Sequence, residues 1–377
     1  MNLNYTLKPD SIALIAVNDI HVSASRDGLI SNSSLLPDQF YVQSNTQVHL
    51  SNAGLWVSAV QDNAPRANLN IGGFSNYTSK WDGNNLGVFH ITPEILKNNI
   101  SNWPAQYGAP VDQNGNPAIY GDEMLFSCLK GTVNPSQMAL NSPIENLRVT
   151  QSVYAYQRSD LKNVIFIRYE LKNMGSKDLN DVFAGFYSDV DINTDQVNNA
   201  IGYDAASGMT YTYFNPKDPN SSKFINCVSG NVFLESPVSD SRFPYSVTGH
   251  RMIERDYGAK DSQFGELLGN AVQALNVLKA LGNDGSSMID PVTNTPTIFA
   301  FTGNPLTGTG WLDQSRDSRN MITTGPFNLK ASESRVITVA MVTAGEKELG
   351  ASLNKLKSQI DLIRNERSLW SFPVSKQ

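Results

Sequence analysis

The sequence predicts a mainly β protein, built as a large antiparallel β-sandwich or as two packed β units, with two peripheral helices. Short apolar runs that alternate with polar residues recur along most of its 377 residues. Asn, Ser, Thr and Gly supply much of the polar sequence, and these residues favour turns between short strands. Only two segments carry the three- and four-residue apolar spacing of an amphipathic helix.

The composition narrows the class of protein. With 40% hydrophobic residues, 17% charged residues and a formal net charge of −6, the chain has no long basic run of the kind that follows nucleic-acid phosphates. Its length exceeds the usual single core, so we expect either a division into residues 1–135 and 136–377 or one large domain. The N-terminal segment lacks a basic region and no apolar run is long enough to span a bilayer, which predicts neither a signal peptide nor a membrane span.

In the first third of the chain, residues 12–31 predict a hairpin with a tight turn at Asp27-Gly28. A β-rich run around Trp56 follows in residues 48–73. Residues 76–120 are dense in Asn, Gly, Pro and aromatic residues, which predicts a long structured loop. Its aromatic side chains either form a platform on which sugar rings stack or plug the edge of the sandwich core; they are Trp81, Trp103, Tyr107 and Tyr120.

The middle of the chain is the clearest strand region. Residues 147–156 alternate apolar and polar side chains, and residues 164–171 and 182–189 each predict a further strand. Short turns separate the three segments, so we expect an antiparallel meander at the structural centre. The last strand leads into an acidic loop.

This acidic loop is the candidate metal site. It places oxygen-bearing side chains at every second position and has a distal carboxylate at its return: Asp189, Asp191, Asn193, Asp195 and Asp204. Calcium prefers several hard oxygen ligands of this kind. The loop is no EF-hand, because Thr194 and Ala200 replace the expected Gly and Glu. The alternative is a loop held by Asx turns, in which each side chain caps nearby backbone N–H groups.

Two amphipathic segments predict the helices. Apolar residues recur at helical spacing in residues 263–281 and again in residues 346–364. Between them, residues 298–301 predict a buried strand and residues 336–342 another. We expect both helices to dock on the sandwich.

The sequence contains no motif typical of nucleophilic catalysis or phosphate binding. The four histidines are scattered, and Cys128 and Cys227 fit no zinc spacing, which leaves two buried thiols or a disulfide. Around Trp311, the residues Asp313, Arg316, Asp317 and Arg319 form either a ligand-facing loop or a network of surface ion pairs.

Several segments, spread over most of the chain in one order, resemble secreted β-rich surface proteins carried by the type IX secretion pathway. They are NAGLWVSA, IFIRYELKNMGS, DVFAGFYSDVDI, FTGNPLTGTGWLD and TTGPFNLKASESRVITVAMVTAG. Asp189, Asp191, Gly202 and Asp204 match the acidic motif of that family, whereas Asn193 replaces its glycine. The resemblance implies export to the cell surface and a sandwich-like architecture.

These observations lead to a first hypothesis of a non-catalytic extracellular or cell-surface protein with a binding or structural role and a calcium-stabilised loop. The alternative is a carbohydrate-active enzyme whose aromatic cleft faces paired carboxylates. A second alternative is a subunit of a self-assembling fibre or layer. The partners expected are a glycan, other surface components or further copies of the chain, and the candidate ligand-binding side chains are Trp81, Trp103, Tyr107, Tyr120 and Trp311.

Overall fold

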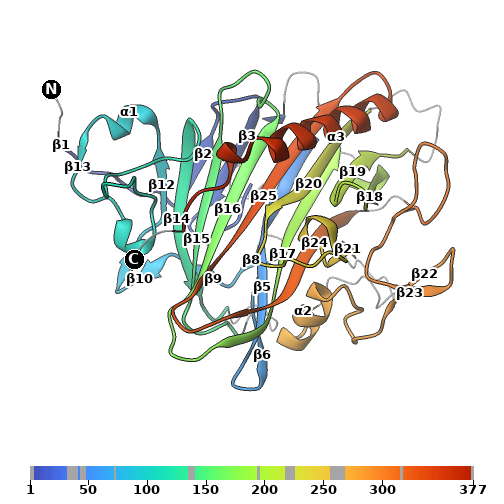
Figure 1. Cartoon of the computed structure of the whole chain (residues 1–377), viewed down its shortest axis with the longest axis horizontal. Helices are drawn as coiled ribbons and strands as arrows, with labels where there is room; N and C mark the ends of the chain where they lie inside the picture. Colours follow the sequence, from blue (N-terminus) through green and yellow to red (C-terminus); the bar gives the residue numbers. More distant parts are fainter. Residues whose placement is uncertain are drawn as a thin grey trace.

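The computed structural model describes residues 4–31, 41–42, 48–71, 74–134, 141–192, 196–216, 226–254, 268–314 and 317–374. The protein is mainly β, as the sequence predicts, and two large antiparallel sheets pack face to face (Figure 1). No helix in these ranges is long and apolar enough to cross a membrane.

Within the described residues, the larger sheet has nine strands. Their order is β12-β14-β15-β16-β25-β20-β19-β18, and β9 also pairs with β14. Their bounds are β9 Tyr77–Thr78, β12 Val88–Ile91, β14 Glu123–Gly131, β15 Leu147–Ala155, β16 Val164–Asn173, β18 Asn199–Asp204, β19 Met209–Phe214, β20 Cys227–Glu235 and β25 Ser334–Gly345.

The smaller sheet packs against one face of the larger one. Its order is β21-β24-β17-β5-β6. The bounds are β5 Val48–Gln61, β6 Ala64–Asn68, β17 Leu179–Ile192, β21 Gly249–Glu254 and β24 Ser318–Leu329. Apolar side chains of both sheets interdigitate between them, among them Ile167 and Tyr169 of β16 and Ala184 and Phe186 of β17.

The predicted meander is wrong at its third strand. β15 and β16 pair as expected, but β16 continues to β25 whereas β17 pairs with β5 and β24 in the other sheet. The chain therefore crosses from one sheet to the other after Asn173. Alternation fixes only which side chains are buried, and two strands that face each other across a sandwich bury their apolar sides in the same core just as two paired strands do.

The opening hairpin is confirmed. β2 (Ile12–Ile15) pairs with β3 (Ile20–Ser25), which also pairs with β4 (Tyr41–Val42). After β3, the Gly28 N–H donates to the Ser25 carbonyl at 2.9 Å, and Gly28 has a φ of +80° that glycine adopts without strain.

The remaining elements are short and lie at the margins of the two sheets. The small strands pair as β1 (Asn4–Tyr5) with β13 (Asn99–Ile100), β7 (Asn70–Ile71) with β8 (Phe74–Ser75), β10 (Lys80–Trp81) with β11 (Asn84–Asn85), and β22 (Met288–Asp290) with β23 (Thr295–Thr297). The short helices are α1 Pro93–Leu96, η1 Ala105–Tyr107, η3 Gln196–Asn198, η4 Pro244–Ser246 and η5 Arg367–Leu369.

Residues on both sides of position 135 contribute to the same sheets. β5 lies inside the smaller sheet beside β17, and β14 lies inside the larger sheet beside β15. The ranges 1–135 and 136–377 therefore share one core between the sheets. Both cysteines are buried and free, which matches the interpretation as two thiols.

The second predicted helix is confirmed as α3 (Leu349–Asn365). It lies across the outer face of the larger sheet, against β20 and β25 (Figure 1). Its apolar stripe is buried there through Leu353, Leu356, Ile360 and Ile363. The chain then runs as a tail through Trp370 and Phe372 over the same face.

The first predicted helix is shorter than expected in the described part of the chain. α2 spans Ala271–Leu278, and residues 255–267 lie outside the described ranges. The helix packs on the outer face of the smaller sheet, where Leu275 and Leu278 join Trp56 and Tyr187.

The N-cap of α2 supports a testable prediction. The Asn270 side chain accepts a hydrogen bond from the Gln273 backbone N–H at 3.1 Å. We expect Asn270→Ala to lower the free energy of unfolding by about 1 kcal/mol, because it leaves that N–H without its cap. Urea denaturation measures the change. Asn270→Asp should retain the wild-type midpoint, and an equal loss in both variants would contradict a capping role.

Candidate functional site

A row of polar side chains crosses the outer face of the larger sheet. Strand alternation turns Ile167 and Tyr169 toward the core between the sheets, and therefore turns Arg168 and Glu170 to the outer face. Arg168 lies opposite Thr338 of β25, and Thr338 lies opposite Glu235 at the end of β20. The register of three strands thus places an arginine, a threonine and a glutamate side by side.

Arg168 is the centre of this group. Its side chain is 3% exposed, and its Nη1 donates to Glu235 Oε2 at 3.1 Å. Thr338 donates to the same carboxylate oxygen at 3.3 Å. The other guanidinium nitrogen, Nη2, donates to the backbone carbonyls of Phe372 and Pro373 in the C-terminal tail, at 3.1 and 3.3 Å. The arginine therefore joins the sheet to the tail.

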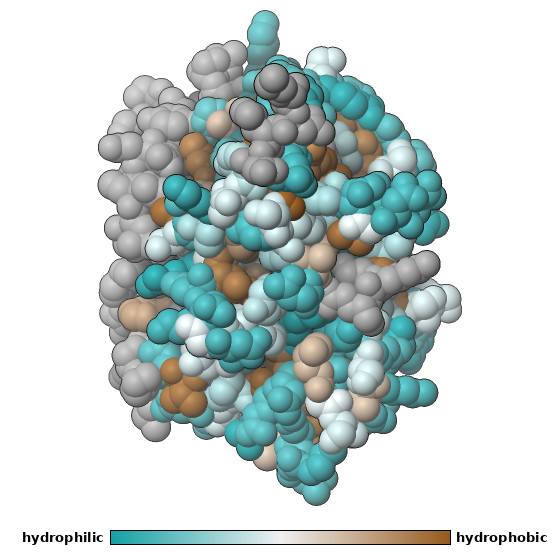
Figure 2. All heavy atoms as spheres, turned by 90° about the vertical axis from the view of Figure 1, so that its left-hand side faces the viewer, coloured by the Kyte–Doolittle hydropathy of each residue, from teal (hydrophilic) through white to brown (hydrophobic). Residues whose placement is uncertain are grey.

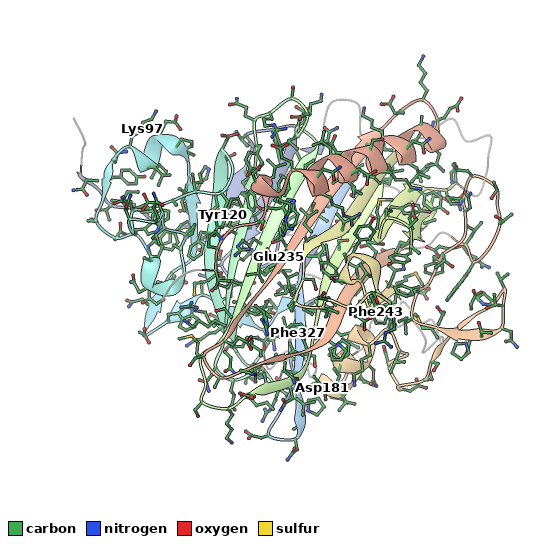
Figure 3. All side chains as sticks on the ribbon, viewed as in Figure 1. Lys97, Tyr120, Asp181, Glu235, Phe243 and Phe327 are labelled. Carbon is green, nitrogen blue, oxygen red and sulfur yellow. The ribbon has the colours of Figure 1, made fainter. Side chains whose placement is uncertain are left out.

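Tyr120 covers the row from the aromatic loop. Its ring stacks on that of Phe372, with 4.1 Å between the centroids and 16° between the planes, and the Arg168 guanidinium carbon lies 5.8 Å from the Tyr120 centroid. Burial raises the pKa of the Tyr120 phenol; the Arg168 cation lowers it, while the carboxylates of Glu170 and Glu235 raise it further. Figure 3 shows Tyr120 and Glu235 near each other in front of this sheet.

We call Tyr120, Arg168, Glu170, Glu235 and Phe372 the sheet-face cluster. Glu170 is buried at 4% exposure, whereas Tyr120, Glu235 and Phe372 are half-buried. Taking charges out of water is costly, and a buried ion pair is weak evidence for stability. Charged groups gathered with aromatic rings on a partly open surface are instead typical of functional sites. The cluster thus gathers two carboxylates, a phenol and a stacked pair of rings, of which Tyr120, Glu235 and Phe372 keep part of their surface exposed.

Of the aromatic residues predicted from the sequence, Tyr120 alone lies in the cluster. The Trp81 indole N–H donates to the Cys128 carbonyl at 3.0 Å, and the Trp103 indole N–H donates to the Pro110 carbonyl at 3.0 Å. Trp81 also contacts Tyr107, with centroids 6.2 Å apart. These rings pack against the apolar part of the outer sheet face, so they extend a core.

The surface near these rings is mixed. On the coloured part of Figure 2, apolar residues are scattered among polar ones and do not form one broad patch. Backbone carbonyls accept the indole N–H groups of Trp81 and Trp103, and both rings and that of Tyr107 pack partly buried on the sheet, which fits the plug interpretation on the sheet face and not at the sandwich edge. A platform for sugar rings at these residues stays a prediction.

The predicted acidic loop begins later than expected, because Asp189 and Asp191 belong to β17. Both are buried on the outer face of the smaller sheet. Asp189 Oδ2 accepts hydrogen bonds from Arg319 Nε at 3.1 Å and from Asn52 Nδ2 at 3.4 Å, and Asp191 Oδ2 accepts one from the Ser51 hydroxyl at 2.9 Å. Protein groups thus bind both carboxylates.

Burial raises the pKa of Asp189 to about 7, against the opposing effect of the Arg319 cation, and the nearby Asp191 carboxylate raises it as well. Arg319 also pairs with Asp317 at 3.1 Å. The interpretation of this segment as a network of ion pairs therefore holds for Asp317 and Arg319, but the network is buried against the sheet and is not a surface feature.

Asp204 is not brought together with Asp189 and Asp191. It ends β18, and its carboxylate pairs with Lys357 of α3 at 2.5 Å. Asn199, at the other end of β18, donates a hydrogen bond to Asp191 from its side chain. Five residues of strand separate the two ends by roughly 16 Å.

Asn193, Asp195 and Arg316 lie outside the described residues. In the part of the chain that the structure does describe, no group of three or more His, Cys, Asp or Glu side chains is arranged to hold a metal ion. Calcium binding by this segment stays a prediction.

Trp311 lies apart from the sheet-face cluster. Its ring packs against Phe301, with centroids 5.1 Å apart. The neighbouring Asp313 accepts a hydrogen bond at 3.0 Å from the backbone N–H of Ile201 on edge strand β18. Trp311 and Asp313 are buried there, at 8% and 3% exposure, in a small core separate from the sheet-face cluster.

Arg168, Glu170 and Glu235 were not predicted from the sequence as site residues. A signal was present: β16 reads VIFIRYELKN, with one Arg and one Glu at alternating positions in a strand that is otherwise apolar on both faces. Glu235 gave no such signal, because its place beside Arg168 depends on β25, whose sequence follows about 100 residues later.

No protein-family model matches the sequence, and no curated protein matches it. Similar solved structures include the Slr1438 protein from Synechocystis sp. PCC 6803, with 11% identity over 92% of this chain and 100% of that one, at a TM-score of 0.37. Another is a polysaccharide lyase, with 9% identity over 94% of this chain and 35% of that chain, at a TM-score of 0.33. Likeness at this level carries neither fold nor function over to this chain.

Proposed function

We propose that this protein binds a carbohydrate at the sheet-face cluster. The observation that carries the proposal is the meeting of a stacked aromatic pair, Tyr120 and Phe372, with the half-buried carboxylate of Glu235. A sugar ring has an apolar C–H face and a polar edge, so it needs an aromatic surface and hydrogen-bonding groups side by side. The cluster supplies both.

Arg168 and Thr338 hold the Glu235 carboxylate in place through its Oε2 atom. This support leaves Oε1 to accept hydrogen bonds from a ligand hydroxyl. Preorganisation of this kind reduces the entropy lost on binding, because the side chain is already ordered. Arg168 is therefore a positioning residue, and Glu235 is the ligand contact.

The role of Glu235 as the ligand contact can be tested directly by substitution. We expect Glu235→Gln to weaken binding of an oligosaccharide at least about tenfold, because hydrogen bonds to a charged acceptor contribute roughly 1.5–3 kcal/mol. Isothermal titration against a panel of soluble oligosaccharides measures the dissociation constants. The control is Glu333→Gln, another glutamate paired with an arginine, Arg335, at 2.6 Å but outside the cluster.

Equal affinities for wild type and Glu235→Gln, with the same circular dichroism spectrum, would exclude the cluster as the binding site. Absence of binding to every oligosaccharide in the panel would count against carbohydrate as the ligand class. If Glu333→Gln also lost binding, the loss in Glu235→Gln would reflect damage to the protein as a whole and not to the sheet-face cluster.

A second candidate function is an enzyme acting on the same carbohydrate. The observation that favours it is the presence of two carboxylates, Glu170 and Glu235, near one phenol, Tyr120. Paired carboxyl groups in different surroundings can serve as acid and base in glycosidic bond chemistry. Mass spectrometry of a bound oligosaccharide after incubation distinguishes the two: cleavage that Glu170→Gln abolishes without loss of binding supports the enzyme, and an unchanged oligosaccharide supports a binding protein.

A further inference from the structure

Three basic side chains form a row across the outer face of the larger sheet, on the adjacent strands β14, β15 and β16 (Figure 1). In the register of the sheet, Lys130 lies opposite Arg148, and Arg148 lies opposite Lys172. Residues directly opposite each other in an antiparallel pair turn their side chains to the same face. Lys172 also shares the outer face with Arg168, because it follows Arg168 by four residues on one strand. We call Lys130, Arg148 and Lys172 the basic row.

The basic row lies within reach of a ligand bound at the sheet-face cluster. The four residues of β16 from Arg168 to Lys172 cover roughly 13 Å. Lys130 and Lys172 are two strand spacings apart, roughly 10 Å, with Arg148 between them. A chain of a few linked sugar rings can therefore occupy the cluster at one end and the row at the other.

The two lysines are the accessible members of the row. Lys130 and Lys172 are half-buried, whereas Arg148 is 3% exposed and donates from Nη1 to the Gln106 carbonyl at 3.4 Å. The Lys130 ammonium lies 5.1 Å from the centroid of the Trp81 ring. Among the residues that the structure describes, no carboxylate forms an ion pair with either lysine. Both ammonium groups can therefore bind an anion from solution.

The arrangement of the row favours an anionic ligand over a purely structural role. Like charges directly opposite each other in a sheet destabilise the pairing of the strands, and here three follow one another across three strands. Their field reaches the neighbouring side chain: burial raises the pKa of the Cys128 thiol to about 12, against the opposing effect of the Arg148 and Lys130 cations. Positive charge gathered on one face attracts anions and raises their local concentration.

We propose that the basic row binds the acidic group, a carboxylate or a sulfate, of a saccharide whose other end occupies the sheet-face cluster. The position of that other end rests on the proposed function. Lys130 and Lys172 contact the anion as point charges, and Arg148 beneath them strengthens the positive potential. The Glu235 carboxylate repels an acidic group in the cluster itself, which assigns the negative group to the part of the ligand over the row. The ligand class is therefore an acidic oligosaccharide.

Substitution of the two lysines tests the basic row. We expect Lys130→Gln and Lys172→Gln each to weaken binding of an oligogalacturonate about fivefold, and the double variant about twentyfold, because each removes one ion pair with the ligand. Lys172→Arg should bind within about twofold of wild type, because it retains the charge. The matched control is Lys347→Gln. Lys347 is exposed and follows the end of β25 at Gly345, whereas Ser334 at the other end of that strand lies opposite Lys172.

Isothermal titration at low and at high salt measures the affinities for four ligands: an oligogalacturonate, a sulfated oligosaccharide, a neutral oligosaccharide of the same length and single-stranded DNA. The two acidic saccharides distinguish a carboxylate from a sulfate as the preferred group. Tighter binding of either one than of the neutral saccharide, weakened by salt and in the lysine variants but not in Lys347→Gln, supports the proposal. The lysine variants should melt no lower than wild type, because they relieve the repulsion between neighbouring like charges.

The basic row and the sheet-face cluster fail separately in this experiment. Equal affinity for acidic and neutral saccharides, with Glu235→Gln still weakening both, overturns the row and leaves the proposed function standing. Acidic binding that the lysine double variant loses and Glu235→Gln retains supports the row and contradicts the cluster. Unchanged acidic binding in the lysine double variant, a lower melting temperature of that variant, binding of the DNA alone, or no binding of any saccharide overturns the proposal.

Discussion

Replacing Arg319 by methionine should lower the free energy of unfolding by about 3–5 kcal/mol. Arg319 is 4% exposed and bonds the buried Asp189 carboxylate at 3.1 Å. Removal of the cation leaves that carboxylate in a site where burial already raises its pKa to about 7. Because this folded-state pKa exceeds the unfolded value, the carboxyl group destabilises the fold as pH rises through 7, so the loss should be largest above that pH.

Urea denaturation at pH 8 measures the effect, with Arg242→Met as the control. Arg242 pairs with Asp240 at 2.6 Å but is 78% exposed, so its loss should cost less than about 1 kcal/mol. The double variant Asp189→Asn with Arg319→Met should regain most of the stability, because the carboxylate that lost its cation is then no longer charged. A cost for Arg319→Met that is no larger than that of Arg242→Met would show that the buried pair does not matter for stability.

Acidification should destabilise the protein through His250. This side chain is fully buried: its Nδ1 atom donates to the Ala300 carbonyl at 2.9 Å, and Nε2 lies 2.8 Å from the Thr210 hydroxyl. Burial lowers its pKa from 6.5 to about 4. The contribution of the neutral imidazole to the free energy of unfolding is present above pH 6.5 and is lost as the pH falls through 4. The loss amounts to roughly 3 kcal/mol.

The measurement compares wild type with His250→Asn by chemical denaturation at pH 7 and pH 4. The wild type should be more stable at pH 7, and the difference should shrink by roughly 3 kcal/mol at pH 4. The comparison with a variant is needed because Asp189 has the opposite pH dependence in this range: its raised pKa favours the fold at low pH. A difference that stays constant between the two pH values would contradict a buried neutral His250.

The strands of this protein could be predicted because alternation of apolar and polar residues is local. The same pattern could not say that β17 leaves β16 for the other sheet, since its partners β5 and β24 come from opposite ends of the sequence. The docked helix α3 was predictable for the same local reason: Leu353, Leu356 and Ile360 share one face.

The candidate sites depended on contacts between distant parts of the chain. Asp189 and Asp191 read as ligands of a loop, but Arg319, 130 residues later, binds the first of them within a sheet. Glu235 reaches Arg168 only across β25, and Phe372 reaches Tyr120 from the C-terminal tail. An extracellular location and assembly with other copies remain predictions from the sequence.

The most direct test of the proposed function is a crystal structure of the protein with a bound oligosaccharide. The sheet-face cluster predicts a sugar ring against the Tyr120 and Phe372 rings, with a hydroxyl within hydrogen-bonding distance of Glu235 Oε1. Density for the oligosaccharide elsewhere, with Tyr120, Phe372 and Glu235 in contact only with protein and water, would contradict it.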